Sequence, residues 1–130
     1  GEFDAYIPRG EDGKKFISLV SNNPIDMPAP IDPDIIIDDE DFDLTPYGVD
    51  AKIIYTPGHV DSNICVVTKD REAICGDTII INPFNDFKGT AALICQDEDA
   101  LKKSFNRLMD EADIFYSGHG GPFKKDNIEY

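Results

Sequence analysis

The chain has 130 residues, a length typical of one domain with its own core. Hydrophobic residues make up 41% and charged residues 29%, the proportions of an ordinary soluble globular protein. The formal net charge of −14 would repel phosphate backbones, so nucleic-acid binding would need a locally basic patch, and the sequence has none. No apolar run approaches the roughly 20 residues that a membrane span needs.

The three cysteines, Cys65, Cys75 and Cys95, are an odd number without the paired spacing of a zinc ribbon or a disulfide framework. Each stands among apolar neighbours, which favours buried, reduced thiols over one disulfide and a free thiol. The start GEFDAYIPRG lacks the basic and apolar regions of a secretory signal. We therefore expect a cytoplasmic protein.

The first segment, residues 1–34, is rich in proline, aspartate and asparagine. Four prolines between positions 24 and 33 exclude a regular element there, because proline removes a backbone donor and fixes φ. We expect an extended loop, preceded by a strand or short helix around KKFISLV (14–20). The composition changes at residue 35, so the chain is divided into a variable, loop-rich segment (1–34) and a main lobe (35–130).

Several short β elements are predicted next. IIID (35–38) is interpreted as a strand, followed by an acidic turn that lacks the glycine and ligand spacing of a calcium loop. AKIIYT (51–56) is a second strand, and NICVVT (63–68) with EAICG (72–76) form a hairpin. TIII (78–81) is a further strand or strand end.

The segment 97–113 gives the clearest helical pattern. Its apolar residues fall at intervals of four, three and four, which places them on one helix face. They are Leu101, Phe105, Leu108 and Ala112. Acidic residues at 97–99 suit the positive end of the helix dipole. IFYSGHGGPF (114–123) then predicts a strand that runs into a glycine-rich turn.

Three polar residues share one context, directly after a predicted strand. His59 follows Thr-Pro-Gly, Asp77 follows a glycine, and His119 lies in Ser-Gly-His-Gly-Gly-Pro. If these strands lie in one sheet, their ends bring two imidazoles and a carboxylate together. That set suits zinc, iron or manganese.

Each of these residues also has a purely structural interpretation. His59 could cap a strand, Asp77 could accept from a turn amide, and His119 could be an exposed turn residue. The spacing alone leaves both interpretations open.

The order of the motifs resembles the C-terminal half of the metallo-β-lactamase superfamily. YTPGHVDSNICVVTKDREAICGDTIIINPF, a helix and IFYSGHGGPF follow one another here. Members of that family show a Thr-Pro-Gly-His turn, a hairpin, a Gly-Asp pair, a helix and a late Gly-His-Gly in the same order. The resemblance implies an α/β protein, part of a metallo-β-lactamase-type αββα sandwich, mainly the C-terminal β-sheet lobe with its flanking helix.

Carried over to this chain, the resemblance implies that His59 ligates one metal, Asp77 bridges two metals and His119 ligates the second. The full site would hold two zinc ions, with iron or manganese as alternatives. The family's His-x-His-x-Asp-His cluster is absent, since no histidine precedes residue 59. Three ligands are too few for tight binding, so the chain alone is expected to bind little metal and to be inactive.

A fragment of a larger enzyme is the favoured explanation, and a degenerate homologue is the alternative. A half-sandwich would expose an apolar sheet face, so we expect self-association or a partner that supplies the N-terminal half. The predicted function is metal-dependent hydrolysis of a small ester, thioester or lactone once that half is present. A non-catalytic interaction module and a di-iron oxidoreductase of the same superfamily are the alternatives.

Overall fold

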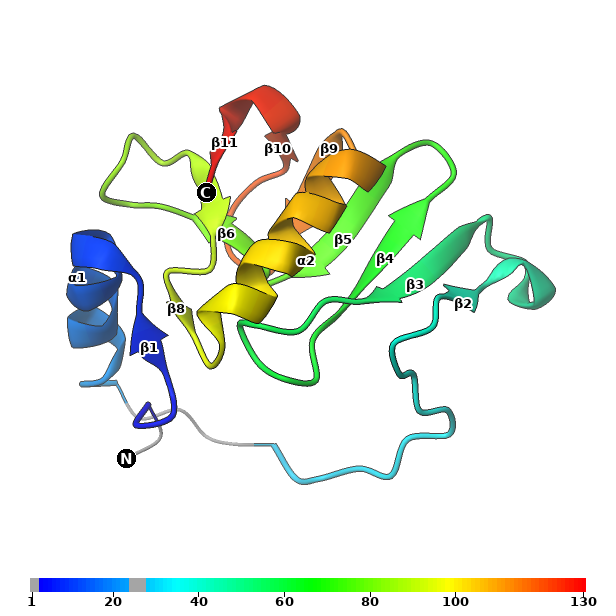
Figure 1. Cartoon of the computed structure of the whole chain (residues 1–130), viewed down its shortest axis with the longest axis horizontal. Helices are drawn as coiled ribbons and strands as arrows, with labels where there is room; N and C mark the ends of the chain where they lie inside the picture. Colours follow the sequence, from blue (N-terminus) through cyan, green and yellow to red (C-terminus); the bar gives the residue numbers. More distant parts are fainter. Residues whose placement is uncertain (1–2, 24–27) are drawn as a thin grey trace.

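The computed structural model describes residues 3–23 and 28–130, which form two helices, two short 3-10 turns and eleven strands (Figure 1). The helical elements are α1 (Gly10–Val20), η1 (Thr45–Tyr47), α2 (Glu98–Glu111) and η2 (Lys125–Asn127). The strands are β1 (Ile7–Pro8), β2 (Phe42–Asp43), β3 (Ala51–Tyr55), β4 (Ile64–Thr68), β5 (Glu72–Gly76), β6 (Ile79–Ile81), β7 (Gly89–Ala91), β8 (Ile94–Cys95), β9 (Ile114–Ser117), β10 (Phe123–Lys124) and β11 (Ile128–Glu129). Within the described ranges, neither helix is long and apolar enough to cross a membrane.

The main sheet has six strands in the order β10-β9-β5-β4-β3-β2. The predicted hairpin is confirmed, because β4 and β5 pair antiparallel. β3 is antiparallel to β4, and β9 is parallel to β5. As a consequence β3, β5 and β9 all run in the same direction and end at the same edge of the sheet. β6, β7 and β11 form a separate three-stranded sheet.

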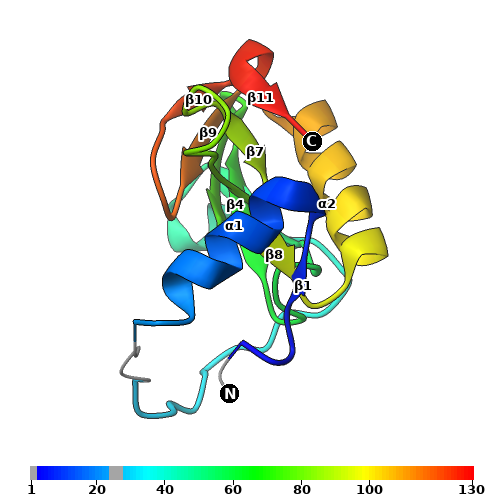
Figure 2. The same cartoon turned by 90° about the vertical axis from the view of Figure 1, so that its left-hand side faces the viewer.

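Helix α2 packs on one face of the main sheet (Figures 1 and 2). Its N-cap Asp97 accepts a hydrogen bond from the Ala100 backbone N–H at 2.9 Å, as expected for an acidic cap. The predicted apolar face is confirmed. All four of its members join the buried core cluster, and they are Leu101, Phe105, Leu108 and Ala112.

The opposite face of the main sheet carries a row of apolar side chains. Register pairing aligns one residue from each of five neighbouring strands. The row consists of Phe42, Ile53, Val66, Ile74 and Tyr116. Cross-strand partners share a face of a sheet, so these side chains form a continuous stripe. Ile74 is 58% exposed and Tyr116 is 41% exposed, so the stripe faces solvent over part of its length.

The strand predicted at 35–38 is wrong. These residues are irregular, and the first strand beyond residue 34 is β2 at Phe42–Asp43, which pairs with β3. Ile36 is 84% exposed, so this apolar run meets neither a partner strand nor the core. A strand is stabilised by cross-strand packing, and β-branched residues without it do not form one. Within the first segment, KKFISLV belongs to helix α1, and positions 24–27 of the predicted proline-rich loop lie outside the described residues.

The core position Leu108 and the surface position Leu19 test this packing. Leu108 is fully buried and Leu19 is 59% exposed. We expect Leu108→Ala to lower the free energy of unfolding by about 2–5 kcal/mol, because it removes buried methyl groups and leaves a cavity. Leu19→Ala should stay within about 0.5 kcal/mol of the parent chain. Urea unfolding followed by circular dichroism measures both, and equal losses would contradict the assignment of α2 to the core.

Candidate metal centre

The three candidate ligands lie where the strands β3, β5 and β9 end. The parallel pairing of β5 with β9 sets Gly76 opposite Ser117. Asp77 follows Gly76 directly, and His119 lies two residues beyond Ser117, so the two side chains meet at one edge of the sheet. His59 arrives from β3 after the Thr-Pro-Gly turn. The topology thus brings the three strand ends to one edge of the sheet, as expected from the sequence.

Asp77 lies between the two histidines. Its Oδ2 lies 3.6 Å from Nε2 of His59, and its Oδ1 lies 2.8 Å from Nδ1 of His119. The His59 side chain is 16% exposed and the Asp77 side chain 28%, whereas the His119 side chain is 67% exposed. The site therefore has a sheltered His59–Asp77 pair and a more open third member.

A backbone carbonyl fixes the orientation of the His59 ring. Nδ1 of His59 lies 2.9 Å from the carbonyl oxygen of Ile94 and donates to it. In a neutral imidazole the other nitrogen then carries a lone pair, and here that nitrogen is turned toward Asp77. Histidine ligands of metals are commonly held in this way by a carbonyl on the far nitrogen.

The spacing of the His59–Asp77 pair matches that of two ligands of one cation. Two ligands at 2.0–2.2 Å from a tetrahedral zinc lie roughly 3.4 Å apart. Nε2 of His59 and Oδ2 of Asp77 lie 3.6 Å apart. The donor types and their separation therefore fit a borderline divalent ion.

His119 is arranged differently. Its Nδ1 lies within hydrogen-bond distance of Asp77, at 2.8 Å, which is shorter than the separation of two ligands on a shared ion. Throughout the described ranges, no group of three or more histidine, cysteine, aspartate or glutamate side chains is arranged to hold a metal ion. The assignment of His59, Asp77 and His119 as metal ligands stays a prediction.

A buried polar network holds the turn that carries His59. The side-chain amide of Asn63 donates to the hydroxyls of Thr56, at 2.9 Å, and Thr78, at 2.7 Å. Both threonines are fully buried. The network links the end of β3 to the residue after Asp77, so it fixes the two strand ends relative to each other.

At two glycines near the site, a side chain would collide with a neighbouring residue. A Cβ on Gly118 would lie 2.4 Å from Oδ1 of Asp77. A Cβ on Gly58 would lie 2.3 Å from the Leu101 backbone, and Gly58 has a φ of +138°. The carbonyl of Pro57, one residue before, accepts a hydrogen bond from Ser104 at 2.7 Å. The Pro-Gly turn is thus packed against the first turns of α2.

Tyr6 is a neighbour of the site that sequence reasoning missed. Its ring lies 5.6 Å from the His59 ring, centroid to centroid, at an angle of 41°. Burial, together with the negative charge of Asp77, raises the pKa of the Tyr6 phenol. The Ile94 carbonyl was missed as well. Neither contact has a local sequence signal, because both join segments far apart in the chain.

The cysteines lie in the core, and Cys65 contacts the buried polar network of Asn63, its Sγ lying 3.0 Å from the hydroxyl oxygen of Thr56. All three are buried and free. Burial raises the pKa of the Cys75 thiol to about 12 and also raises that of Cys65, so both stay protonated at neutral pH. The prediction of buried, reduced thiols is confirmed.

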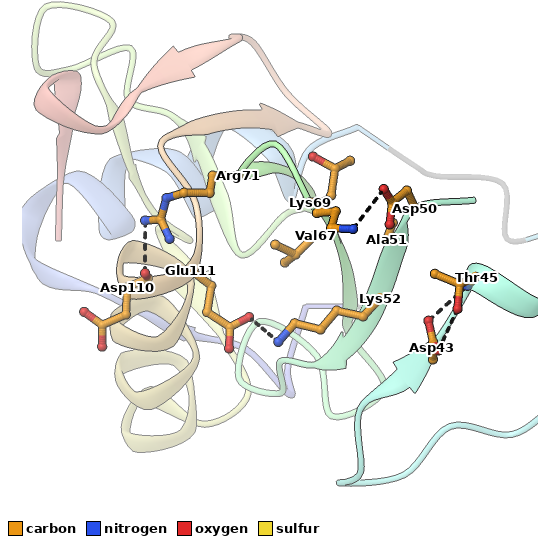
Figure 3. Close-up of a pocket in the computed structure, with 11 residues that line it drawn as sticks. Asp43, Thr45, Asp50, Ala51, Lys52, Val67, Lys69, Arg71, Asp110 and Glu111 are labelled. Atoms are coloured by element: carbon orange, nitrogen blue, oxygen red, sulfur yellow. Dashed lines mark hydrogen bonds and ion pairs between the residues drawn. The ribbon is translucent and has the colours of Figure 1, made fainter. Parts of the chain in front are cut away.

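A hollow of ≈ 430 Å³ lies away from the three candidate metal ligands, between the C-terminal end of α2 and strands β3 and β4 (Figure 3). The three cations that line it are each paired with an acid. Lys52 lies 3.2 Å from Glu111, Lys69 lies 3.6 Å from Asp50, and Arg71 lies 2.8 Å from Asp113. These charges are already matched within the chain, so the hollow is a weaker ligand site than its size suggests.

Comparison with solved structures identifies the architecture. An archaeal metallo-β-lactamase superfamily protein from Sulfolobus tokodaii matches 89% of this chain with a TM-score of 0.52 and 21% sequence identity. The chain has part of the metallo-β-lactamase fold. A metallo-β-lactamase family protein from Thermus thermophilus matches 74% of the chain at 22% identity and a TM-score of 0.46. No protein-family model matches the sequence.

The match covers only part of the larger proteins. This chain spans 45% of the Sulfolobus tokodaii protein and 32% of the Thermus thermophilus protein. The resemblance inferred from the order of motifs is therefore confirmed at the level of the metallo-β-lactamase fold, and for a part of that fold.

Gly58 and Gly48 provide a matched test of the turn that carries His59. Both have positive φ, but a Cβ on Gly48 would meet open space. We expect Gly48→Ala to cost about 1–2 kcal/mol of unfolding free energy, from the left-handed backbone alone. Gly58→Ala should cost at least about 3 kcal/mol, because the helix backbone must also move. Equal losses in chemical denaturation would show that the turn does not depend on contact with α2.

Proposed function

We propose that this chain is the C-terminal part of a metal-dependent hydrolase of the metallo-β-lactamase superfamily. Its substrate is a small ester, thioester or lactone, and hydrolysis requires further metal ligands from the N-terminal half of the fold. The observation that carries the proposal is the His59–Asp77 pair. The Ile94 carbonyl holds the imidazole so that Nε2 faces a carboxylate oxygen at 3.6 Å.

His59, Asp77 and His119 would hold the metal in this proposal, zinc in the first instance with iron or manganese as alternatives. When bound, such an ion supplies a water of lowered pKa and polarises a carbonyl group. His59 would bind as a ligand whose ring orientation is already set by the Ile94 carbonyl. His119 would exchange its hydrogen bond to Asp77 for a metal contact, and its side chain is 67% exposed.

Two further features of the chain agree with this proposal. The three free thiols suit a reducing compartment, so we place the protein in the cytoplasm. The apolar row lies on the sheet face opposite α2 and is exposed at Ile74 and Tyr116, which suits a partner. We propose the N-terminal half of the same fold as that partner. The Sulfolobus tokodaii protein is more than twice as long as the region this chain covers.

A non-catalytic interaction module is the second candidate function. It is favoured by the same apolar row, because exposed stripes of this kind commonly mark protein contacts. The two candidates differ in what they require of His59 and Asp77. An interaction module tolerates their loss, whereas a hydrolase does not.

Metal binding is tested most directly by the two imidazoles, which are the only ones in the chain. In ¹⁵N-labelled protein titrated with Zn²⁺, we expect the Nε2 resonance of His59 to shift while Nδ1 keeps its hydrogen bond to Ile94. Asp77→Asn should weaken the binding more than tenfold, because it removes the facing ligand. Asp61→Asn is the control, an exposed carboxylate two residues from His59. Three ligands can still hold zinc weakly, so the titration extends to millimolar zinc. No imidazole shift at that concentration, or equal affinity in Asp77→Asn, would contradict the metal site.

The uncovered face is tested with two isoleucine-to-lysine variants that add the same charge. Ile74 lies in the apolar row, and Ile36 is exposed outside the sheet. We expect the chain on its own to bind an apolar dye and to self-associate at high concentration. Ile74→Lys should weaken that association at least tenfold, and Ile36→Lys should leave it unchanged. A monomer in sedimentation with no dye binding would contradict the proposed contact face.

A further inference from the structure

A cavity of ≈ 210 Å³ borders the candidate metal centre. Three of its ten lining residues are the candidate ligands themselves. Six others have purely apolar side chains, and they are Phe3, Phe16, Val20, Ile80, Leu93 and Ile94. Tyr6 completes the lining, and none of these described residues is a lysine or arginine. A ligand in this cavity would therefore meet apolar walls and a single polar end.

The N-terminal segment forms one wall of the cavity. Phe16 and Val20 come from α1, and Tyr6 comes from the residues before β1. This wall is tied to the main body, because β1 pairs with β8. Arg9 strengthens the link by donating to the carbonyls of Ala91, at 3.1 Å, and Ala92, at 3.0 Å. Figure 2 shows α1 beside β8, the strand that pairs with β1.

The facing wall belongs to the core. Ile80, Leu93 and Ile94 are each at most 5% exposed. Ile94 also provides the carbonyl that orients His59. The same backbone segment thus lines the cavity and aims the imidazole into it, so a ligand held by the apolar walls is placed next to Nε2 of His59.

The volume limits what the cavity can hold. Pockets that bury drug-sized ligands measure roughly 300–1,000 Å³. A volume of ≈ 210 Å³ is smaller and corresponds to about seven water-sized groups. A negatively charged group would find no basic side chain among the described lining residues to pair with, and burying an unpaired charge is costly.

We propose that this cavity is the acyl pocket of the site and selects a substrate with a short, uncharged, apolar acyl group of about six carbons. The inference rests on the proposed hydrolase function and adds its substrate class. Phe16 and Val20 set the length that fits, and His59 with Asp77 lies at the polar end, where the carbonyl of the substrate would sit.

The test measures the binding of small molecules to metal-free protein, so that its result does not depend on whether the chain binds zinc. N-methyl alkanamides from acetamide to decanamide serve as probes, followed by the methyl resonances of Val20, Ile80 and Leu93 in ¹³C-labelled protein. We expect affinity to rise about fourfold for each added CH₂, the gain from burying one methylene. The rise should stop near six carbons, where the cavity is filled.

Matched variants on α1 locate the binding site. Val20→Phe should shift the limit to a chain shorter by about two carbons, because the larger ring takes up space in a close-packed wall. Val20→Ala should shift it to longer chains. Leu19→Phe, on the exposed side of the same helix, should leave the series unchanged. Circular dichroism and thermal unfolding confirm that each variant is folded.

The outcomes separate this inference from the metal proposal. Affinity that does not depend on chain length, or a limit that Val20→Phe and Val20→Ala leave in place, would overturn the acyl pocket even if zinc binds. A limit near six carbons that moves with residue 20 supports the pocket, whatever the zinc titration gives. If zinc does not shift the imidazole resonances but the amides still bind, the hydrolase proposal is refuted and the cavity remains a small-molecule binding site.

Discussion

The parallel pairing of β5 with β9 is the constraint on which the site depends. It joins segments about forty residues apart and sets Gly76 opposite Ser117, so that Asp77 and His119 emerge at the same edge. The intervening chain has to cross the sheet to make this parallel pair, and α2 is part of that crossover. The helix that buries the core cluster is thus also the connection that returns the chain to the site.

Buried hydrogen bonds then convert this coarse alignment into a defined geometry. The amide of Asn63 bridges two fully buried threonines, and leaving any of these groups without a partner would cost about 1–3 kcal/mol. The Ile94 carbonyl does the same for the His59 ring. These contacts explain why Nε2 of His59 lies at a ligand-like distance from Asp77. The exposed side chain of His119 has no such contact and lies at hydrogen-bond distance from Asp77 instead.

Much of this arrangement could be predicted from local sequence. The helical spacing of α2 and the turns at residues 58, 76 and 118 depend on nearby residues alone, so periodicity and glycine placement were sufficient. The strand predicted at 35–38 failed because strand formation depends on a partner, and the partner of β3 is Phe42–Asp43 instead. The contacts of Tyr6 and Ile94 with His59 could not be predicted for the same reason, since they arise only from tertiary packing.

Some features of the molecule have all their contacts within this chain, and others need contacts from further residues. The core face of the main sheet, the cavity beside His59 and the orientation of the His59 ring are all completed by residues of this chain. No described residue of the chain completes the apolar row through Ile74 or the coordination of His119. Each of these two features is unfavourable. The row leaves apolar area exposed to water, and the metal centre has too few ligands for tight binding. One additional layer of the same fold, packed on that sheet face and carrying further ligands, would remove both costs at once, whereas a partner that only covered the face would leave the ligand set incomplete.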